Sequence, residues 1–124
     1  MTTNILYIED DATQIELVRM FVAKEGFAIL GAQDGMTGIQ IALAQQPALI
    51  LMDINLPSMN GVDVAYHMRN TPEIAHIPII ALTSTMKGSV IEPYVGTLFE
   101  AYVQKPITRA DLLAYLQHFV GQPE

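Results

Sequence analysis

The chain has 124 residues, of which 51% are hydrophobic, so we expect a single domain, residues 1–124, with a core of its own. The formal net charge of −7 argues against the basic surface of a nucleic-acid binder, and no direct contact with nucleic acid is expected. The sequence has no cysteine, no apolar run as long as a bilayer span and no basic start typical of a secretory signal. These absences predict a cytoplasmic protein that does not insert into a membrane.

Taken in chain order, the first half of the sequence predicts two strand–helix units and a third strand. Asn4–Ile8 is a short apolar strand, and Asp11 has the spacing of an N-cap for the helix that follows. Ala28–Gly31 is a weaker strand, after which Asp34 caps a helix of small residues. That helix is expected to face inward through Met36, Ile39, Ala42 and Leu43. Ala48–Met52 is a continuous apolar run, as expected for a strand covered on both faces.

The second half continues the alternation. A helix is predicted after Gly61, strands at Pro78–Leu82 and Ala101–Gln104, and a last helix capped by Thr108. Between the last two strands the signals conflict, because the capping pattern Ser-Val-Ile-Glu at 89–92 is followed by a proline. A short helix beginning near Pro93 reconciles them. Strand–helix alternation throughout predicts a doubly wound parallel α/β sheet with helices on both faces.

Chemically reactive side chains lie at the ends of four predicted strands. They are Glu9 and Asp10 after the first strand, then Asp53, Thr83 and Lys105 at the ends of the third, fourth and fifth. The carboxyl ends of parallel strands meet at one edge of an open sheet, where ligands bind. Acids brought together there would repel one another by roughly 4 kcal/mol per pair at contact distance. A divalent cation would relieve that repulsion, so the sequence predicts a cation site suited to phosphoryl chemistry.

Each of these residues also has an ordinary structural explanation. Acids after a strand often cap the next helix, and Asp11 is expected to do only that. Thr83 alone is typical of a strand-end hydroxyl with a backbone partner, and Lys105 alone is typical of a surface charge. Asp53 is the strongest functional signal, because an aspartate at the end of a hydrophobic strand is rarely placed deep without a partner or a metal.

The chain resembles the receiver domains of bacterial two-component signalling, the response-regulator family typified by the chemotaxis receiver. The matching segments, in the family's order, are Ile5–Asp11, Leu49–Gly61, Ile77–Ser84 and Tyr102–Pro106. The resemblance implies a flavodoxin-like fold, with a five-stranded parallel sheet of order 2-1-3-4-5 and five flanking helices. It also implies a signalling protein rather than an enzyme, which is a monomer or weak dimer. Its partners would be a histidine kinase or histidine phosphotransfer protein and a downstream target protein.

The resemblance assigns a role to each matching position. Asp53 corresponds to the aspartate that accepts a phosphoryl group, and Thr83 and Lys105 to the hydroxyl and the ammonium that contact it. Tyr102 corresponds to the aromatic that rotates on activation, and Pro106 to a proline that follows a cis bond. The implied Mg²⁺ ligands are Asp10, Asp53, the backbone carbonyl of Asn55 and, through a water molecule, Glu9.

The output surface implied by the family lies between the fourth strand and the last helix. In this chain it would include Met86, Lys87, Tyr94 and Tyr102. The sequence departs from the family there, because Leu98–Ala101 stands where receivers usually have a small, glycine-containing turn. We therefore expect this face to be specialised for an unusual partner or dimer arrangement.

Two other functions use similar residues. A hydrolase of the haloacid dehalogenase type also forms an aspartyl phosphate with Mg²⁺, but it needs a second aspartate two residues after the nucleophile. This chain has Asn55 at that position and no insertion long enough for a cap domain. A receiver that serves only as an interaction module is disfavoured, because every phosphorylation position is filled. The prediction is a phospho-accepting switch that assists only its own phosphorylation and dephosphorylation.

Overall fold

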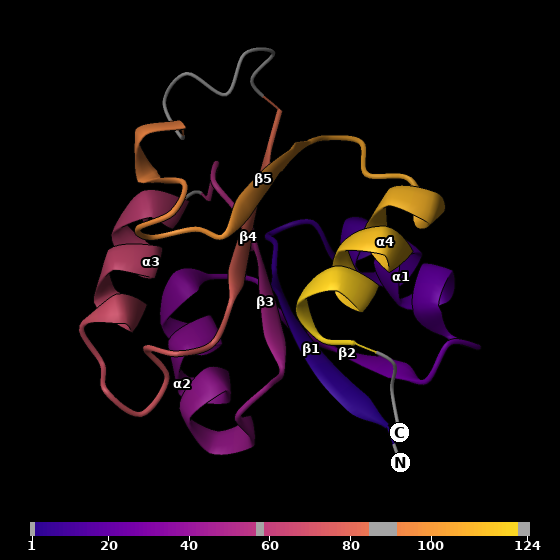
Figure 1. Ribbon diagram of the computed structural model, residues 1–124, viewed down its shortest axis with the longest axis horizontal. Coiled ribbons are helices and arrows are strands. Elements are labelled where there is room, and N and C mark those ends of the chain that lie inside the picture. Colours follow the sequence, from indigo (N-terminus) through magenta and orange to yellow (C-terminus); the bar gives the residue numbers. More distant parts are fainter. Residues whose placement is uncertain (1, 57–58, 85–91, 122–124) are drawn as a thin grey trace.

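The computed structural model describes residues 2–56, 59–84 and 92–121, and these form a three-layer α/β fold (Figure 1). The strands are β1 (Thr3–Ile8), β2 (Phe27–Ala32), β3 (Leu49–Asp53), β4 (Ile79–Thr83) and β5 (Ala101–Gln104). They build a single five-stranded sheet of order β2-β1-β3-β4-β5, in which every pair is parallel. The predicted parallel sheet and its strand order are confirmed.

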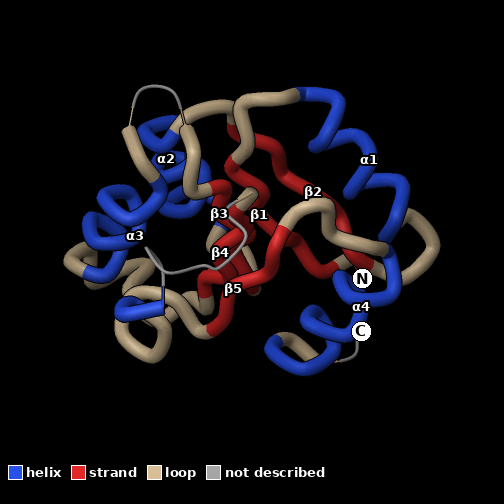
Figure 2. Tube along the Cα trace, turned by 90° about the horizontal axis from the view of Figure 1, so that it is seen from above, coloured by secondary structure: helices blue, strands red, loops and turns tan. Residues whose placement is uncertain are grey.

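Helices of the described residues cover both faces of the sheet (Figure 2). On one side are α1 (Ala12–Val22) and α4 (Arg109–Phe119), and on the other α2 (Gly35–Gln45) and α3 (Gly61–Arg69). The side chains of Asp11, Asp34 and Thr108 each accept a hydrogen bond from a first-turn N–H, which confirms them as N-caps. In the described part of the chain, no helix is long and apolar enough to cross a bilayer.

The core consists of two layers, one on each face of the sheet. Successive side chains of a strand point to opposite faces. Leu6 and Ile50 accordingly pack under α2 and α3, whereas Ile5 and Leu51 pack under α1 and α4. The strands β3 and β4 are buried along their whole length, as predicted for apolar runs covered on both sides.

The inward face of α2 differs from the prediction. Met36 and Leu43 were expected to be buried, but they are 51% and 41% exposed. Ile39 and Ala42 are buried as predicted, together with Gly35 and Gly38, and a Cβ added at Gly38 would lie 2.4 Å from Cδ1 of Ile8. A glycine at this position lets the helix axis approach the sheet closely, and this contact fixes which side of the helix faces inward.

The short helix predicted near Pro93 is confirmed only in part, as a turn of 3-10 helix. In the described residues there are four α-helices rather than the five implied, and Glu92–Tyr94 forms a single 3-10 turn. The Tyr94 carbonyl accepts hydrogen bonds from the N–H groups of residues 97, 98 and 99, and Gly96 has a φ of +92°. A residue with positive φ cannot continue a right-handed helix, so the chain turns toward β5. Residues 89–91 of the predicted capping pattern 89–92, together with Met86 and Lys87, lie outside the described residues.

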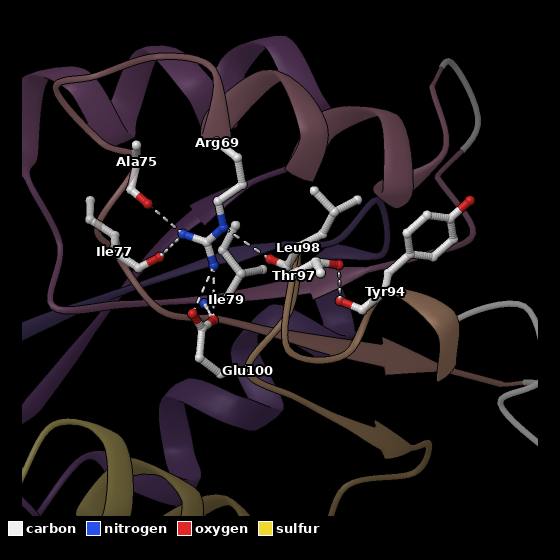
Figure 3. A network of polar contacts seen from close by, with 8 residues as sticks. All are labelled: Arg69, Ala75, Ile77, Ile79, Tyr94, Thr97, Leu98 and Glu100. Carbon is white, nitrogen blue, oxygen red and sulfur yellow. Dashed lines mark hydrogen bonds and ion pairs between the residues drawn. The ribbon is translucent and has the colours of Figure 1, made fainter.

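The chain that leads into β5 is fixed by one arginine near the end of α3 (Figure 3). The Arg69 guanidinium donates hydrogen bonds to the carbonyls of Ala75, Ile77 and Leu98 at 2.8, 2.7 and 3.1 Å. It also donates to both carboxylate oxygens of Glu100, at 3.0 and 2.9 Å. Glu100 Oε2 in turn accepts from the N–H of residue 79 at 2.7 Å, where β4 begins. The Arg69–Glu100 network therefore joins α3, the start of β4 and the approach to β5.

Candidate functional site

The sheet brings the predicted site residues to its carboxyl edge. Glu9 and Asp10 follow β1, Asp53 ends β3 and Thr83 ends β4. Along the neighbouring strands, Asp53 is paired with residue 82, and Thr83 is paired with residue 104, which immediately precedes Lys105. Because the strands are parallel and in register, all of these side chains leave the sheet at one end, as predicted.

Three carboxylates meet at this edge. One oxygen from each of Glu9, Asp10 and Asp53 lies within 4.8 Å of the others. Glu9 and Asp53 are only 2% and 3% exposed, whereas Asp10 is exposed to solvent. The three form part of the wall of an open depression of ≈ 500 Å³, together with Lys105 and Pro106. A set of hard oxygen donors at this spacing fits a small divalent cation such as Mg²⁺.

The Lys105 ammonium lies between two of these acids. Its Nζ is 2.5 Å from Glu9 Oε1 and 3.3 Å from Asp53 Oδ2. The backbone fixes the start of this side chain, since the Lys105 N–H donates to the Thr83 carbonyl at 2.7 Å. The Lys105–Pro106 peptide bond is cis, as the resemblance implies.

Glu9 is held by more than the lysine. The Tyr7 hydroxyl donates to Glu9 Oε1 at 3.1 Å, and the Asp11 N–H donates to Oε2 at 3.2 Å. Tyr7 is 1% exposed and was not among the predicted site residues. The available signal was its spacing, because residues two apart on a strand project to the same face.

Asp53 and the loop after it are also tied together. Asp53 Oδ1 accepts a hydrogen bond from the Asn55 N–H at 3.0 Å, and the Asn55 side-chain amide donates to Ser84 Oγ at 3.1 Å. The two carboxylate oxygens of Asp53 therefore have different partners, a backbone N–H on Oδ1 and the lysine on Oδ2. The contact with Ser84 joins this loop to the end of β4.

The electrostatics of the site follow from burial and these contacts. Burial raises the pKa of Asp53, and the Asn55 N–H and the Lys105 charge offset only part of that rise. Burial acts on Glu9 in the same direction, but the bonds from Lys105 and the Asp11 N–H outweigh it and lower the pKa of Glu9. Burial alone would lower the pKa of Lys105, yet its two acidic partners raise it. The site thus combines a stable Glu9–Lys105 ion pair with an aspartate that holds its proton more tightly than usual.

The remaining predicted residues lie around this centre. Thr83 is 1% exposed at the end of β4, next to the residue that pairs with Asp53. Tyr102 is half-buried in β5 beside Ala81 and packs against the core layer under α2 and α3. Asn55 is exposed at the rim. The structure therefore gathers the predicted residues at one end of the sheet, with Tyr102 on the strand that leads to Lys105.

Comparison with known proteins agrees with this arrangement. The family model for the response regulator receiver domain matches residues 5–117. The polar-differentiation response regulator DivK of Brucella ovis is 31% identical over 122 residues, which cover 98% of both chains. The solved receiver domain of the sensor histidine kinase PA1611 from Pseudomonas aeruginosa, described with a magnesium ion coordinated in its active-site cleft, is 27% identical. Its TM-score is 0.85, over 98% of this chain and 100% of that one.

A further solved structure shares the fold. The chemotaxis response regulator CheY4 of Vibrio cholerae is 21% identical, with a TM-score of 0.86 over 96% of this chain and 99% of that chain. The strand order, the acidic edge and the family model lead to the same classification. The chain belongs to the response regulator receiver domain family.

Proposed function

We propose that this chain is a phospho-accepting signalling switch in which Asp53 receives a phosphoryl group. The donor is a phosphohistidine on a histidine kinase or a histidine phosphotransfer protein. The observation that carries the proposal is the meeting of three carboxylates and one ammonium at the carboxyl edge of a receiver sheet. Among the three acids, Asp53 is the one that lies inside a strand, as the last residue of the buried strand β3, and its Oδ2 lies 3.3 Å from the Lys105 Nζ.

Mg²⁺ is the cofactor that this donor set suits. Asp10, Asp53 and the Asn55 carbonyl are its proposed direct ligands, and Glu9 its ligand through water. The three hydrogen-bond donors already on Glu9 support that indirect role, because they occupy oxygens that a direct ligand would need. The magnesium ion described in the PA1611 receiver supports the choice of metal. When bound, Mg²⁺ neutralises charge on the phosphoryl oxygens.

The transfer is a single displacement. An Asp53 carboxylate oxygen forms a bond to phosphorus as the bond from phosphorus to the histidine nitrogen breaks. The bonding electron pair stays on that nitrogen. The other ring nitrogen of the donor phosphohistidine carries a proton in this step, so the imidazole leaves as a neutral group. The Lys105 ammonium and the Thr83 hydroxyl are the protein groups proposed to stabilise the phosphoryl oxygens.

Phosphorylation would then change a surface away from Asp53 through the charge that it adds. An aspartyl phosphate brings about −1.5 to −2 charges and new acceptor oxygens to this edge. Thr83 is proposed to move toward it and Tyr102 to turn inward, which changes the surface formed by the segment after β4, β5 and α4. A downstream protein that prefers one state of this surface reads the signal. We further propose that residues 1–124 act as one cytoplasmic domain, as a monomer or weak dimer.

Labelling with a small phosphodonor tests the proposal. The protein is treated with acetyl phosphate and Mg²⁺, and intact mass is followed over time. We expect a labile mass increment of one phosphoryl group, lost on standing and absent from Asp53→Asn. Many turnovers of acetyl phosphate per protein would instead support a hydrolase. A protein that neither gains the increment nor turns over the donor would be an interaction module.

A further inference from the structure

Tyr7 is a buried polar residue at the site that the proposed mechanism does not use. Its hydroxyl donates to Glu9 Oε1, the same oxygen that pairs with Lys105 Nζ at 2.5 Å. The other oxygen, Oε2, accepts from the Asp11 N–H at 3.2 Å. Glu9 lines the depression, and one of its oxygens lies within 4.8 Å of an oxygen of each of the other two acids, but three donors hold its two oxygens.

We infer that Tyr7 determines the selectivity of the cation site. Its hydrogen bond keeps the Glu9 carboxylate paired with Lys105, and the site therefore prefers Mg²⁺ over Ca²⁺. The inference rests on the proposed function, because it concerns the same cation site. Tyr7 does not touch the cation. It acts through Glu9, as a positioning residue.

The physical reason is the number of carboxylates that each ion needs. Mg²⁺ is small, keeps several waters and is satisfied by one or two carboxylates. Ca²⁺ takes six to eight oxygens in flexible geometry and gains from every added carboxylate. While Tyr7 and Lys105 hold Glu9, the site offers Asp10 and Asp53 as direct ligands, which suits Mg²⁺. Without the tyrosine hydroxyl, the carboxylate has one donor fewer and turns more readily toward the cation.

Tyr7→Phe removes the hydroxyl and keeps the ring that packs in the core. Dissociation constants for Mg²⁺ and Ca²⁺ are measured by isothermal titration calorimetry on the full chain, in the absence of any phosphodonor. We expect the Ca²⁺ constant to fall by about tenfold, the factor that corresponds to the lower end of a hydrogen bond to a charged group. The Mg²⁺ constant should fall less, so the preference for Mg²⁺ shrinks.

Three further variants isolate the cause. Tyr66→Phe removes an exposed hydroxyl from α3 and should leave both constants unchanged. Glu9→Gln removes the carboxylate charge, and adding Tyr7→Phe to it should change the Ca²⁺ constant no further. If Tyr7 only filled space in the core, its substitution would have the same effect with or without the Glu9 carboxylate.

The outcomes separate this inference from the proposed function. An unchanged ratio of the two constants in Tyr7→Phe, or an equal change in the Glu9→Gln background, overturns the role of Tyr7 and leaves the cation site standing. A parent protein that binds neither ion overturns both. A narrowed ratio in Tyr7→Phe that disappears in the double variant supports the inference.

Discussion

Replacing Arg69 by methionine should lower the free energy of unfolding by about 2–3 kcal/mol. Removing one partner of a buried ion pair commonly lowers the free energy of unfolding by about 3–5 kcal/mol, because the other charge stays buried without a partner. The Arg69 side chain is 14% exposed, but Glu100 is 36% exposed, so water can partly replace the arginine there. This exposure reduces the expected loss. Methionine keeps most of the apolar part of the arginine side chain. The loss of stability therefore measures the contacts of the guanidinium and not the opening of a cavity.

Urea titration followed by circular dichroism measures the effect, provided that the transition is two-state. A loss of this size should lower the melting temperature by roughly 10 °C in a domain of this length. Glu16→Gln is the matched control, because it breaks the exposed pair that Glu16 forms with Arg19 on α1. That control should change stability by no more than about 0.5 kcal/mol.

A second variant tests the geometry of the contact. Arg69→Lys keeps the charge but cannot serve three carbonyls and a carboxylate at once, so it should recover less than half of the loss. If Arg69→Met costs no more than Glu16→Gln, or if Arg69→Lys restores full stability, the Arg69–Glu100 network does not stabilise the fold in the way described.

Three more predictions concern the acidic edge. Burial raises the pKa of Asp53, so the ionised form reduces stability above that pKa and the penalty disappears as the pH falls through it. Asp53→Asn should therefore make the metal-free protein more stable at neutral pH, and Lys105 keeps Glu9 as its ion-pair partner in this variant. Urea titrations across pH should show that gain shrinking in acid, and a gain independent of pH would contradict the assignment. Mg²⁺ at ten times its dissociation constant should stabilise the parent by about 1.4 kcal/mol. Thermal unfolding of Asp10→Ala should lack this shift, and an equal shift in both proteins would remove Asp10 from the ligand set. A Cβ at Gly61 would lie 2.7 Å from the Asp53 carbonyl oxygen and 2.9 Å from the Ile54 Cα, both in the backbone. The backbone at Asp53 must therefore shift in Gly61→Ala, which should lower the free energy of unfolding by about 1–3 kcal/mol in urea titration and slow labelling by acetyl phosphate. A normal labelling rate would show that the backbone shift does not disturb Asp53.

Most of the fold could be predicted because its signals are local. The apolar runs of β3 and β4 and the capping side chains Asp11 and Thr108 act within a few residues of where they stand. The orientation of α2 could be predicted only in part, because Ile39 and Ala42 are buried as expected but Met36 and Leu43 are exposed. Its residues are small and apolar on several sides, and the close contact between Gly38 and Ile8, far apart in sequence, decides which side faces the sheet.

In the candidate site, too, some features could be predicted from the sequence and others could not. Glu9, Asp53 and Lys105 could be placed together because each follows a strand, and parallel strands end at a common edge. Tyr7 was missed because a tyrosine inside an apolar strand is typical of the core. Away from the site, the contacts of Arg69 could not be predicted, because three of its partners are backbone carbonyls, which every type of residue carries.

The resting position of Lys105 has a consequence for how strongly the protein can respond. Its ammonium already contacts Glu9 at 2.5 Å and Asp53 at 3.3 Å. A phosphoryl group on Asp53 would therefore compete with Glu9 for an ammonium that is already paired. The contribution of Lys105 to any rearrangement is then the difference between the free energies of its old and new pairings, which is smaller than the full free energy of the new pairing.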